Sequence, residues 1–147
     1  MTPGQAISIT INQDADRVEL ERRMQADGIR IKVVTHKQSR SKISARSPAG
    51  TTPALIDTAE LQGCLALSRA EGQEIVITIK PGGAPAEAMA AFAQEGVLIG
   101  LGESHTAQAA IRIKAPRDLL VLREELLELG ETYGTARAKH SKVLNTI

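Results

Sequence analysis

The stretch GQAISITI at residues 4–11 recurs as GQEIVITI at residues 72–79, 68 positions later in the chain. The same offset aligns Gly28 with Gly96, and the alignment needs no gap over 45 positions. Glycine and proline positions stay in phase, which two unrelated strand-like segments would not do, so the pattern predicts a tandem duplication. The identical residues are Gly4, Gln5, Ile7, Ile9, Thr10, Ile11, Glu19, Gly28, Ile31, Ile43 and Pro48 of the first copy.

Each copy begins with a strand that is followed by a helix. The isoleucines of residues 7–11 alternate with polar residues, which is the period of a half-buried strand. The helix of the first copy, DADRVELERRMQADG, has Asp16 as its expected N-cap. That of the second copy, APAEAMAAFAQEG, has Pro85 at its first position. Gly28 and Gly96 follow these helices, where a left-handed C-terminal cap is expected.

A β-hairpin follows the helix in each copy. Its strands are IRIKVV at 29–34 and KISARSP at 42–48 in the first copy, and VLIGLG at 97–102 and AAIRIKAP at 109–116 in the second. Short polar turns separate the strands of each pair. The sequence therefore predicts a mainly β (α+β) fold with inserted helices, in which two tandem repeats form an intertwined pseudo-dimer of antiparallel sheets.

The two copies differ at their ends. CLALSRAEG at 64–72 forms an additional strand before the second copy, and the first copy has no counterpart. RDLLVLREELLELGE follows the second copy and predicts a strand that turns into a short helix ending near Gly130. The expected units are a degenerate repeat without its first strand at 1–63, a complete repeat at 64–130 and a flexible tail at 131–147.

Composition narrows the class of function. Lys and Arg number 18 and Asp and Glu 17, so net charge gives no general attraction to nucleic acid or membranes. Phe92 and Tyr133 are the only aromatic residues, which argues against base stacking on aromatic platforms. Cys64 is the single cysteine and excludes an intramolecular disulfide framework. We expect a soluble cytoplasmic protein with no metal, no cofactor and no enzymatic activity, because no acid–base pair or Ser-His-Asp pattern is present.

The segments CLALSRAEGQEIVI, AIRIKAPRD and LLVLREEL resemble the CsrA/RsmA family of carbon storage regulators, and APRDLLVLREEL at 115–126 is the most specific stretch. The inserted helix resembles the family's RsmN variant. Ala70 departs from the family, which usually has an arginine there. The resemblance implies a small dimeric RNA-binding protein that acts on GGA motifs in mRNA leaders or small RNAs and thereby regulates translation.

The resemblance also implies an RNA site, in which the first strand of one protomer joins the last strand of the other. Arg123 stands at the position of the family's main RNA-contacting arginine. The residues that match the family's RNA contacts are Leu67 and Arg69 on the first strand, and Arg117, Leu119, Val121, Arg123 and Glu125 around the last strand.

The chemistry of these residues permits two interpretations. An arginine fork can bond a guanine edge bidentately, which is worth about 1–3 kcal/mol of base discrimination. Leu119, Val121 and Arg123 alternate and share one face of a strand, where an apolar strip could hold unpaired bases without an aromatic ring. In the other interpretation, Leu119 and Val121 are core residues, and Arg123 pairs with Glu125 or covers the strand.

The first copy departs from the family's pattern. Leu55, or Asp57 after a two-residue shift, stands at the position equivalent to Arg123. We therefore expect one chain to hold an incomplete composite site, which a homodimer would complete. An alternative hypothesis is a degenerate CsrA-like paralogue that does not bind RNA and acts through protein–protein pairing. A third is a plain structural or oligomerisation module.

Basic residues are concentrated in the first copy, where no Asp or Glu occurs between Asp27 and Asp57. Such a surface could contact phosphates, with an affinity that falls steeply with salt. The alternative is a solvated sheet face. The candidate phosphate contacts are Arg30, Lys32, Arg40, Lys42 and Arg46.

Overall fold

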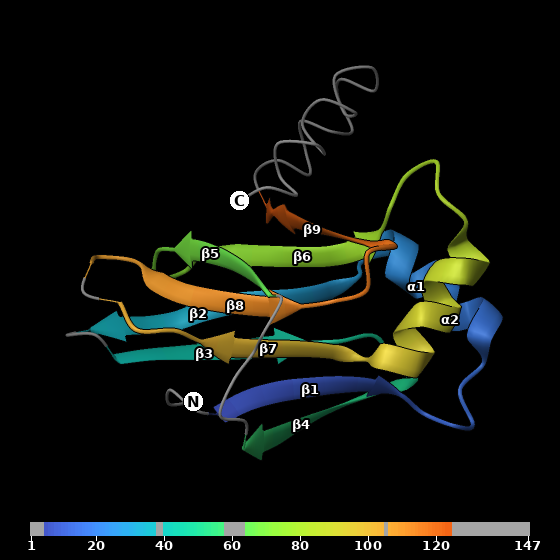
Figure 1. Ribbon diagram of the computed structural model, residues 1–147, viewed down its shortest axis with the longest axis horizontal. Helices are drawn as coiled ribbons and strands as arrows, with labels where there is room; N and C mark the ends of the chain where they lie inside the picture. Colours follow the sequence, from blue (N-terminus) through green and yellow to red (C-terminus); the bar gives the residue numbers. More distant parts are fainter. Residues whose placement is uncertain (1–4, 38–39, 58–63, 105, 125–147) are drawn as a thin grey trace.

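The computed structural model describes residues 5–37, 40–57, 64–104 and 106–124. Its helices and strands in these ranges have the types and order expected from the sequence (Figure 1), and a strand at Thr51–Asp57 that was not expected from the sequence is added to them. The short helix expected near Gly130 and the tail at 131–147 lie outside the described residues. In chain order the elements are β1 (Gln5–Ile11), α1 (Arg17–Ala26), β2 (Ile29–Lys37), β3 (Arg40–Arg46), β4 (Thr51–Asp57), β5 (Leu65–Arg69), β6 (Glu74–Ile79), α2 (Pro85–Glu95), β7 (Val97–Leu101), β8 (Ala109–Lys114) and β9 (Leu119–Arg123).

The strands form two antiparallel sheets. One has five strands in the order β4-β1-β7-β8-β5, and the other has four in the order β3-β2-β6-β9. Each sheet combines strands of both copies, because β1 pairs with β7 and β2 pairs with β6. The 68-residue offset relates β1 to β6, α1 to α2, β2 to β7, β3 to β8 and β4 to β9. The expected mainly β fold with two helices and antiparallel sheets is confirmed.

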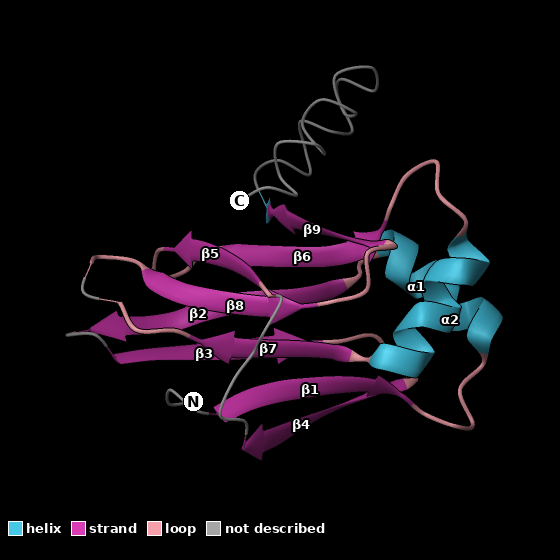
Figure 2. Cartoon of the chain, in the orientation of Figure 1, coloured by secondary structure: helices cyan, strands magenta, loops and turns pink. Residues whose placement is uncertain are grey.

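The hydrophobic core lies between the sheets and consists almost entirely of aliphatic side chains. Alternating Ile and Val residues of β1, β2, β6 and β7 point into it, as the period of two requires. Both helices close one end of the sandwich (Figure 2), where Leu20, Met24 and Phe92 are buried. Phe92 is therefore a core residue. Within the described residues, no helix is long and apolar enough to cross a membrane.

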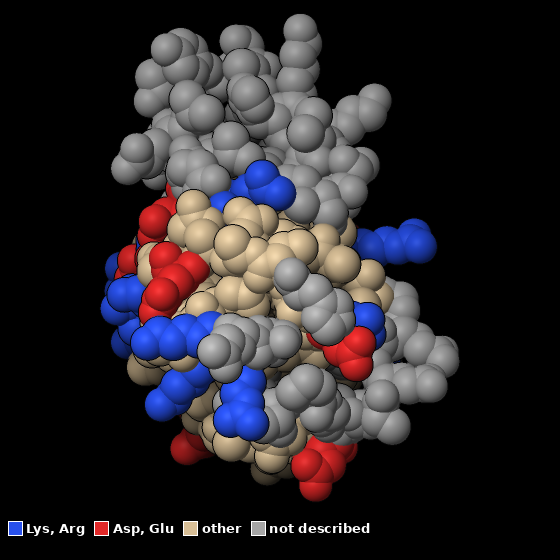
Figure 3. Space-filling model, turned by 90° about the vertical axis from the view of Figure 1, so that its left-hand side faces the viewer, with Lys and Arg blue, Asp and Glu red and all other residues tan. Residues whose placement is uncertain are grey.

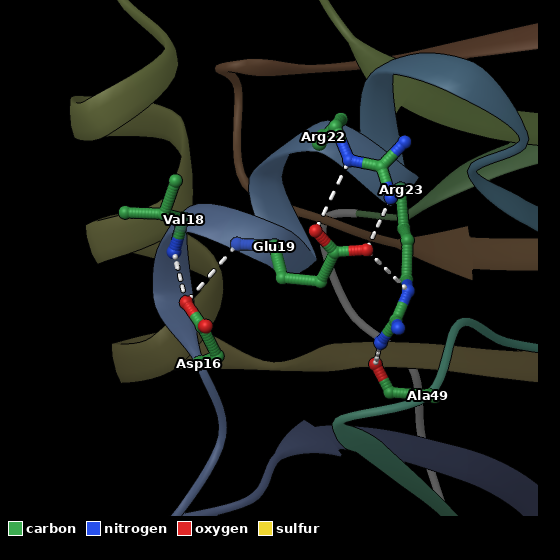
Figure 4. A network of polar contacts seen from close by, with 6 residues as sticks. All are labelled: Asp16, Val18, Glu19, Arg22, Arg23 and Ala49. Atoms are coloured by element: carbon green, nitrogen blue, oxygen red, sulfur yellow. Dashed lines mark hydrogen bonds and ion pairs between the residues drawn. The ribbon is translucent and has the colours of Figure 1, made fainter.

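The start of α1 is capped as the sequence predicts (Figure 4). The Asp16 carboxylate accepts hydrogen bonds from the backbone N–H groups of Val18 at 3.1 Å and Glu19 at 3.2 Å. These donors have no partner within the helix, so the cap satisfies them. Pro85 opens α2, also as predicted, and that helix has no side-chain cap.

We expect Asp16→Ala to lower the free energy of unfolding by about 1 kcal/mol, because two helix-terminal N–H groups lose their acceptor. Urea denaturation of the wild type and the variant measures the difference. Asp14→Ala is the control, because it removes the same charge two residues earlier. Equal losses in both variants would show that charge rather than capping decides the effect.

Gly28 and Gly96 make equivalent close approaches to strands of the opposite copy. Their φ angles are 65° and 70°. A Cβ on Gly28 would overlap the carbonyl oxygen of Ile77 in β6, and one on Gly96 would lie 3.2 Å from that of Ile9 in β1. Ile9 and Ile77 are themselves equivalent under the 68-residue offset. The glycines therefore let each helix end directly against the strand that pairs with the next element.

The expected left-handed cap needs one correction. Gly96 combines its positive φ with a ψ of −173°, which lies outside the left-handed helical region. The chain enters β7 immediately after Gly96 and must already be extended there. In α1 the cap residue is Asp27, and Gly28 follows it.

Candidate nucleic-acid interface

The first and last strands of the second copy are edge strands of the two sheets, and both contribute to one cavity. Among the described strands, β5 is outermost in the five-stranded sheet and pairs with β8, whereas β9 is outermost in the other sheet and pairs with β6. Both lie along the upper side of the sandwich in Figure 1. A cavity of about 250 Å³, called here the β5–β9 cavity, is lined by residues that come from both strands and their neighbours. These are Leu65, Lys80, Ile113, Ala115, Pro116, Arg117, Leu119 and Val121.

The β5–β9 cavity has aliphatic walls and two cations in its lining. A turn after β8 holds Arg117 in an exposed position, because the N–H of Leu119 donates to the carbonyl of Pro116 at 3.0 Å. Lys80 directly follows β6, and its backbone N–H donates a hydrogen bond to the carbonyl of Asp118 in this turn at 3.4 Å. Pockets for small-molecule ligands usually measure about 300–1,000 Å³. The cavity is thus closer in size to a single base or side chain than to a large metabolite.

The apolar residues predicted to contact RNA belong largely to the core. Leu67, Leu119 and Val121 have exposed fractions of 4, 3 and 7% and pack in the main hydrophobic cluster. Their burial favours the interpretation in which these residues belong to the core. Leu119 and Val121 nevertheless also form part of the cavity wall, so they both support the fold and shape the cavity.

Arg69 and Arg123 lie at the ends of β5 and β9, beyond the apolar part of the cavity. Arg69 is only 3% exposed, which leaves little of its surface for RNA. Arg123 is partly buried and pairs across the sheet with Ile75. Among the described residues its buried Nε has no hydrogen-bond acceptor. Glu125, the predicted partner of Arg123, lies outside the described residues.

A pair of carboxylates, Glu74 and Glu124, borders this end of the site. A hydrogen bond to Glu74, then burial and the negative charge of Glu74, raise the pKa of Glu124 above its usual value. The charges of Arg30 and Arg69 act in the opposite direction. Sequence reasoning missed this pair, because it depends on β6 lying between β2 and β9.

We expect Glu124→Gln to change the pH dependence of stability. The folded state holds a proton on Glu124 more tightly than the unfolded state does, whose pKa is about 4.3. The stability gained from this proton is complete below that value and is lost as pH rises through the folded pKa. The variant should therefore gain stability relative to the wild type between pH 4 and pH 7, as measured by urea denaturation. A constant difference would contradict this expectation.

The basic residues of the first copy divide into two groups. Arg30 is 21% exposed and lies 3.9 Å from Glu74 and 4.0 Å from Glu124, so carboxylates oppose a phosphate there. Lys32, Arg40, Lys42 and Arg46 are exposed, and the last three are on β3. Figure 3 shows Lys and Arg side chains on the end of the molecule where the β2–β3 hairpin turns. A hollow of about 770 Å³ at this hairpin is lined by Thr35, Lys37, Arg40, Ser41 and Lys42.

Comparison of the sequence with protein-family models and with curated proteins finds no match. In the part of the chain that the structure describes, no group of three or more His, Cys, Asp or Glu residues is arranged to hold a metal ion. Two candidate surfaces follow. One is the β5–β9 cavity, with Arg117 and Lys80 in its lining, and the other is formed by the exposed basic residues of β3.

Proposed function

We propose that the protein binds single-stranded RNA along the β5–β9 cavity and regulates translation after transcription. The observation that carries this proposal is the meeting of β5 and β9 at one aliphatic cavity with Arg117 and Lys80 in its lining. The resemblance of residues 64–130 to the carbon storage regulators supports it and suggests GGA motifs in mRNA leaders or small RNAs as targets. On this proposal the fold consists of two CsrA-like repeats with inserted helices.

Different residues would contact the bases and the phosphates of the RNA. An unpaired base would enter between the aliphatic walls, where Leu119 and Val121 present side-chain edges. Arg117 and Lys80 would contact phosphates, because their charges lie at the cavity beside an exposed turn. The resemblance implies that Arg123, at the end of β9, would be the main base contact, because a guanidinium can bond a guanine edge bidentately.

One chain supplies both strands of this proposed site. β5 and β9 belong to the same copy, so the proposal needs no second molecule to join them. The first copy offers no equivalent site, because Leu55 replaces the key arginine. One RNA site per chain is therefore expected. The homodimer remains a prediction, which light scattering of the purified protein checks.

Fluorescence anisotropy with a labelled RNA hairpin tests the proposal. The loop of the hairpin contains GGA, and the control hairpin has CCA at the same positions. We expect the GGA hairpin to bind more tightly and its affinity to fall with increasing salt, because phosphate contacts release counterions. Equal affinity for both loops, or no binding to either, would contradict the proposal.

A second candidate function is protein–protein pairing without RNA binding. The burial of Arg69 and the carboxylates Glu74 and Glu124 favour it, because negative charges beside Arg30 and Arg69 repel phosphates. Failure of the wild type to bind the GGA hairpin at low salt would support this alternative.

A further inference from the structure

The four-stranded sheet has an open edge at β3 that its equivalent in the other sheet does not have. β8 lies between β7 and β5, whereas β3, its equivalent under the 68-residue offset, pairs with β2 alone. Within residues 5–37, 40–57, 64–104 and 106–124, no strand occupies the outer side of β3. Its outward backbone N–H and C=O groups can therefore accept another strand.

Side chains around this edge are exposed where their equivalents are buried. β9 is buried along Leu119 to Leu122, on the side of the molecule where β5 is present. Its equivalent β4 is exposed from Thr52 to Asp57, and Leu55 has an exposed fraction of 66%. In β3 itself Ile43 reaches the core, while Ala45 is only partly buried. Apolar surface thus remains accessible beside the open edge.

The positive charge of β3 favours an acidic partner strand. Arg40, Lys42 and Arg46 alternate with less exposed residues along the strand, and β2 and β3 contain no acidic residue. Antiparallel pairing of two β3 strands about Ile43 would place arginines opposite arginines, which is destabilising. Another molecule of this protein is therefore a poor occupant of this edge, whereas an acidic strand complements it.

We propose that β3 is the docking edge for an extended acidic segment of another protein, which joins the four-stranded sheet as a fifth strand. Such strand addition obtains affinity from backbone hydrogen bonds and specificity from alternate side chains. The surface is distinct from the β5–β9 cavity, so the proposal does not depend on RNA binding.

The pairing of β5 with β8 indicates the pattern that this segment needs. Leu67 lies opposite Ile111 and Ser68 opposite Ala110. Under the 68-residue offset, the equivalent positions of β3 are Ile43 and Lys42. A docked segment should therefore carry apolar residues facing Ile43 and Ala45, and acidic residues at the intervening positions beside Lys42.

A fluorescein-labelled seven-residue peptide of alternating Glu and Leu tests the proposal by anisotropy with the full chain. A peptide with Lys in place of Glu is the control. We expect the Glu peptide to bind at least tenfold more tightly than the Lys peptide. Arg40→Glu combined with Lys42→Glu should weaken its binding at least tenfold. Arg17→Glu combined with Arg22→Glu on α1 makes the same charge change elsewhere and should leave binding nearly unchanged.

Hydrogen–deuterium exchange distinguishes strand addition from general charge attraction. The Glu peptide should slow amide exchange in β3, because its backbone covers the open edge. No binding of the Glu peptide, binding that Arg40→Glu and Lys42→Glu leave unchanged, or protection elsewhere than β3 would overturn the proposal. Oligouridine of eight residues provides a further comparison. If the charge-reversed variant loses affinity for this RNA but not for the Glu peptide, the surface binds phosphates and the proposal is overturned.

Discussion

Arg123→Ala is expected to weaken binding of the GGA hairpin about 5- to 150-fold, which corresponds to about 1–3 kcal/mol for loss of a bidentate base contact. The reason is the bidentate contact with a guanine edge that we propose for Arg123 at the end of β9. The variant should also discriminate less between GGA and CCA loops. Anisotropy titrations with both hairpins measure the two effects.

Two further variants separate base recognition from phosphate contact. Arg117→Ala should weaken binding to both hairpins equally and reduce the slope of log affinity against log salt by about 1. Arg22→Ala, on the exposed face of α1, should change neither affinity nor discrimination, because Arg22 pairs with Glu19 and is not among the residues that line the cavity. If Arg123→Ala left affinity and discrimination intact, the base-reading role of Arg123 would be refuted.

Gly28→Ala is expected to lower the free energy of unfolding by more than about 2 kcal/mol. A positive φ costs a non-glycine residue about 1–2 kcal/mol. In addition, the new Cβ would overlap the backbone of β6 at Ile77, which cannot move without disturbing its pairing with β2 and β9. Urea denaturation followed by circular dichroism measures the loss.

Gly82 provides a matched control. It has a φ of 77° and nothing within 4 Å of an added Cβ, so Gly82→Ala reports backbone strain alone. Gly96 is not used as a control, because its ψ of −173° adds strain of its own for any other residue. We therefore expect a larger loss at Gly28 than at Gly82. Equal losses at these two sites would show that the close approach to the opposite copy is unimportant.

Elements that depend on local signals could be predicted from the sequence. Alternating isoleucines indicate β1 and β6, because they place an apolar residue at every second position of a strand. Asp16 marks the start of α1 because its carboxylate accepts hydrogen bonds from the first N–H groups of the helix. Pro85 marks the start of α2 because the first helical position does not need a backbone N–H. The 68-residue repeat then predicts equivalent elements in both copies, and the structure has them in that order.

The candidate site was only partly predictable. The sequence indicates that Leu119 and Val121 share a face with Arg123, but not whether that face is core or cavity wall. The structure makes both residues core and places their edges on the cavity. Similarly, Arg30 looks free of acidic neighbours along the chain. Glu74 and Glu124 reach it only because β2 and β6 pair across the two copies.

By itself, the sequence determined the duplication, the strands, the helices and the aliphatic nature of the core, because these depend on residues close together in the chain. The tertiary structure alone decided that β5 and β9 line one cavity and that, among the described strands, none covers the outer edge of β3. Both facts depend on which strands of two similar copies pair with each other. That choice comes from packing the apolar faces of both sheets against one another, and the spacing of residues along the chain does not reveal it.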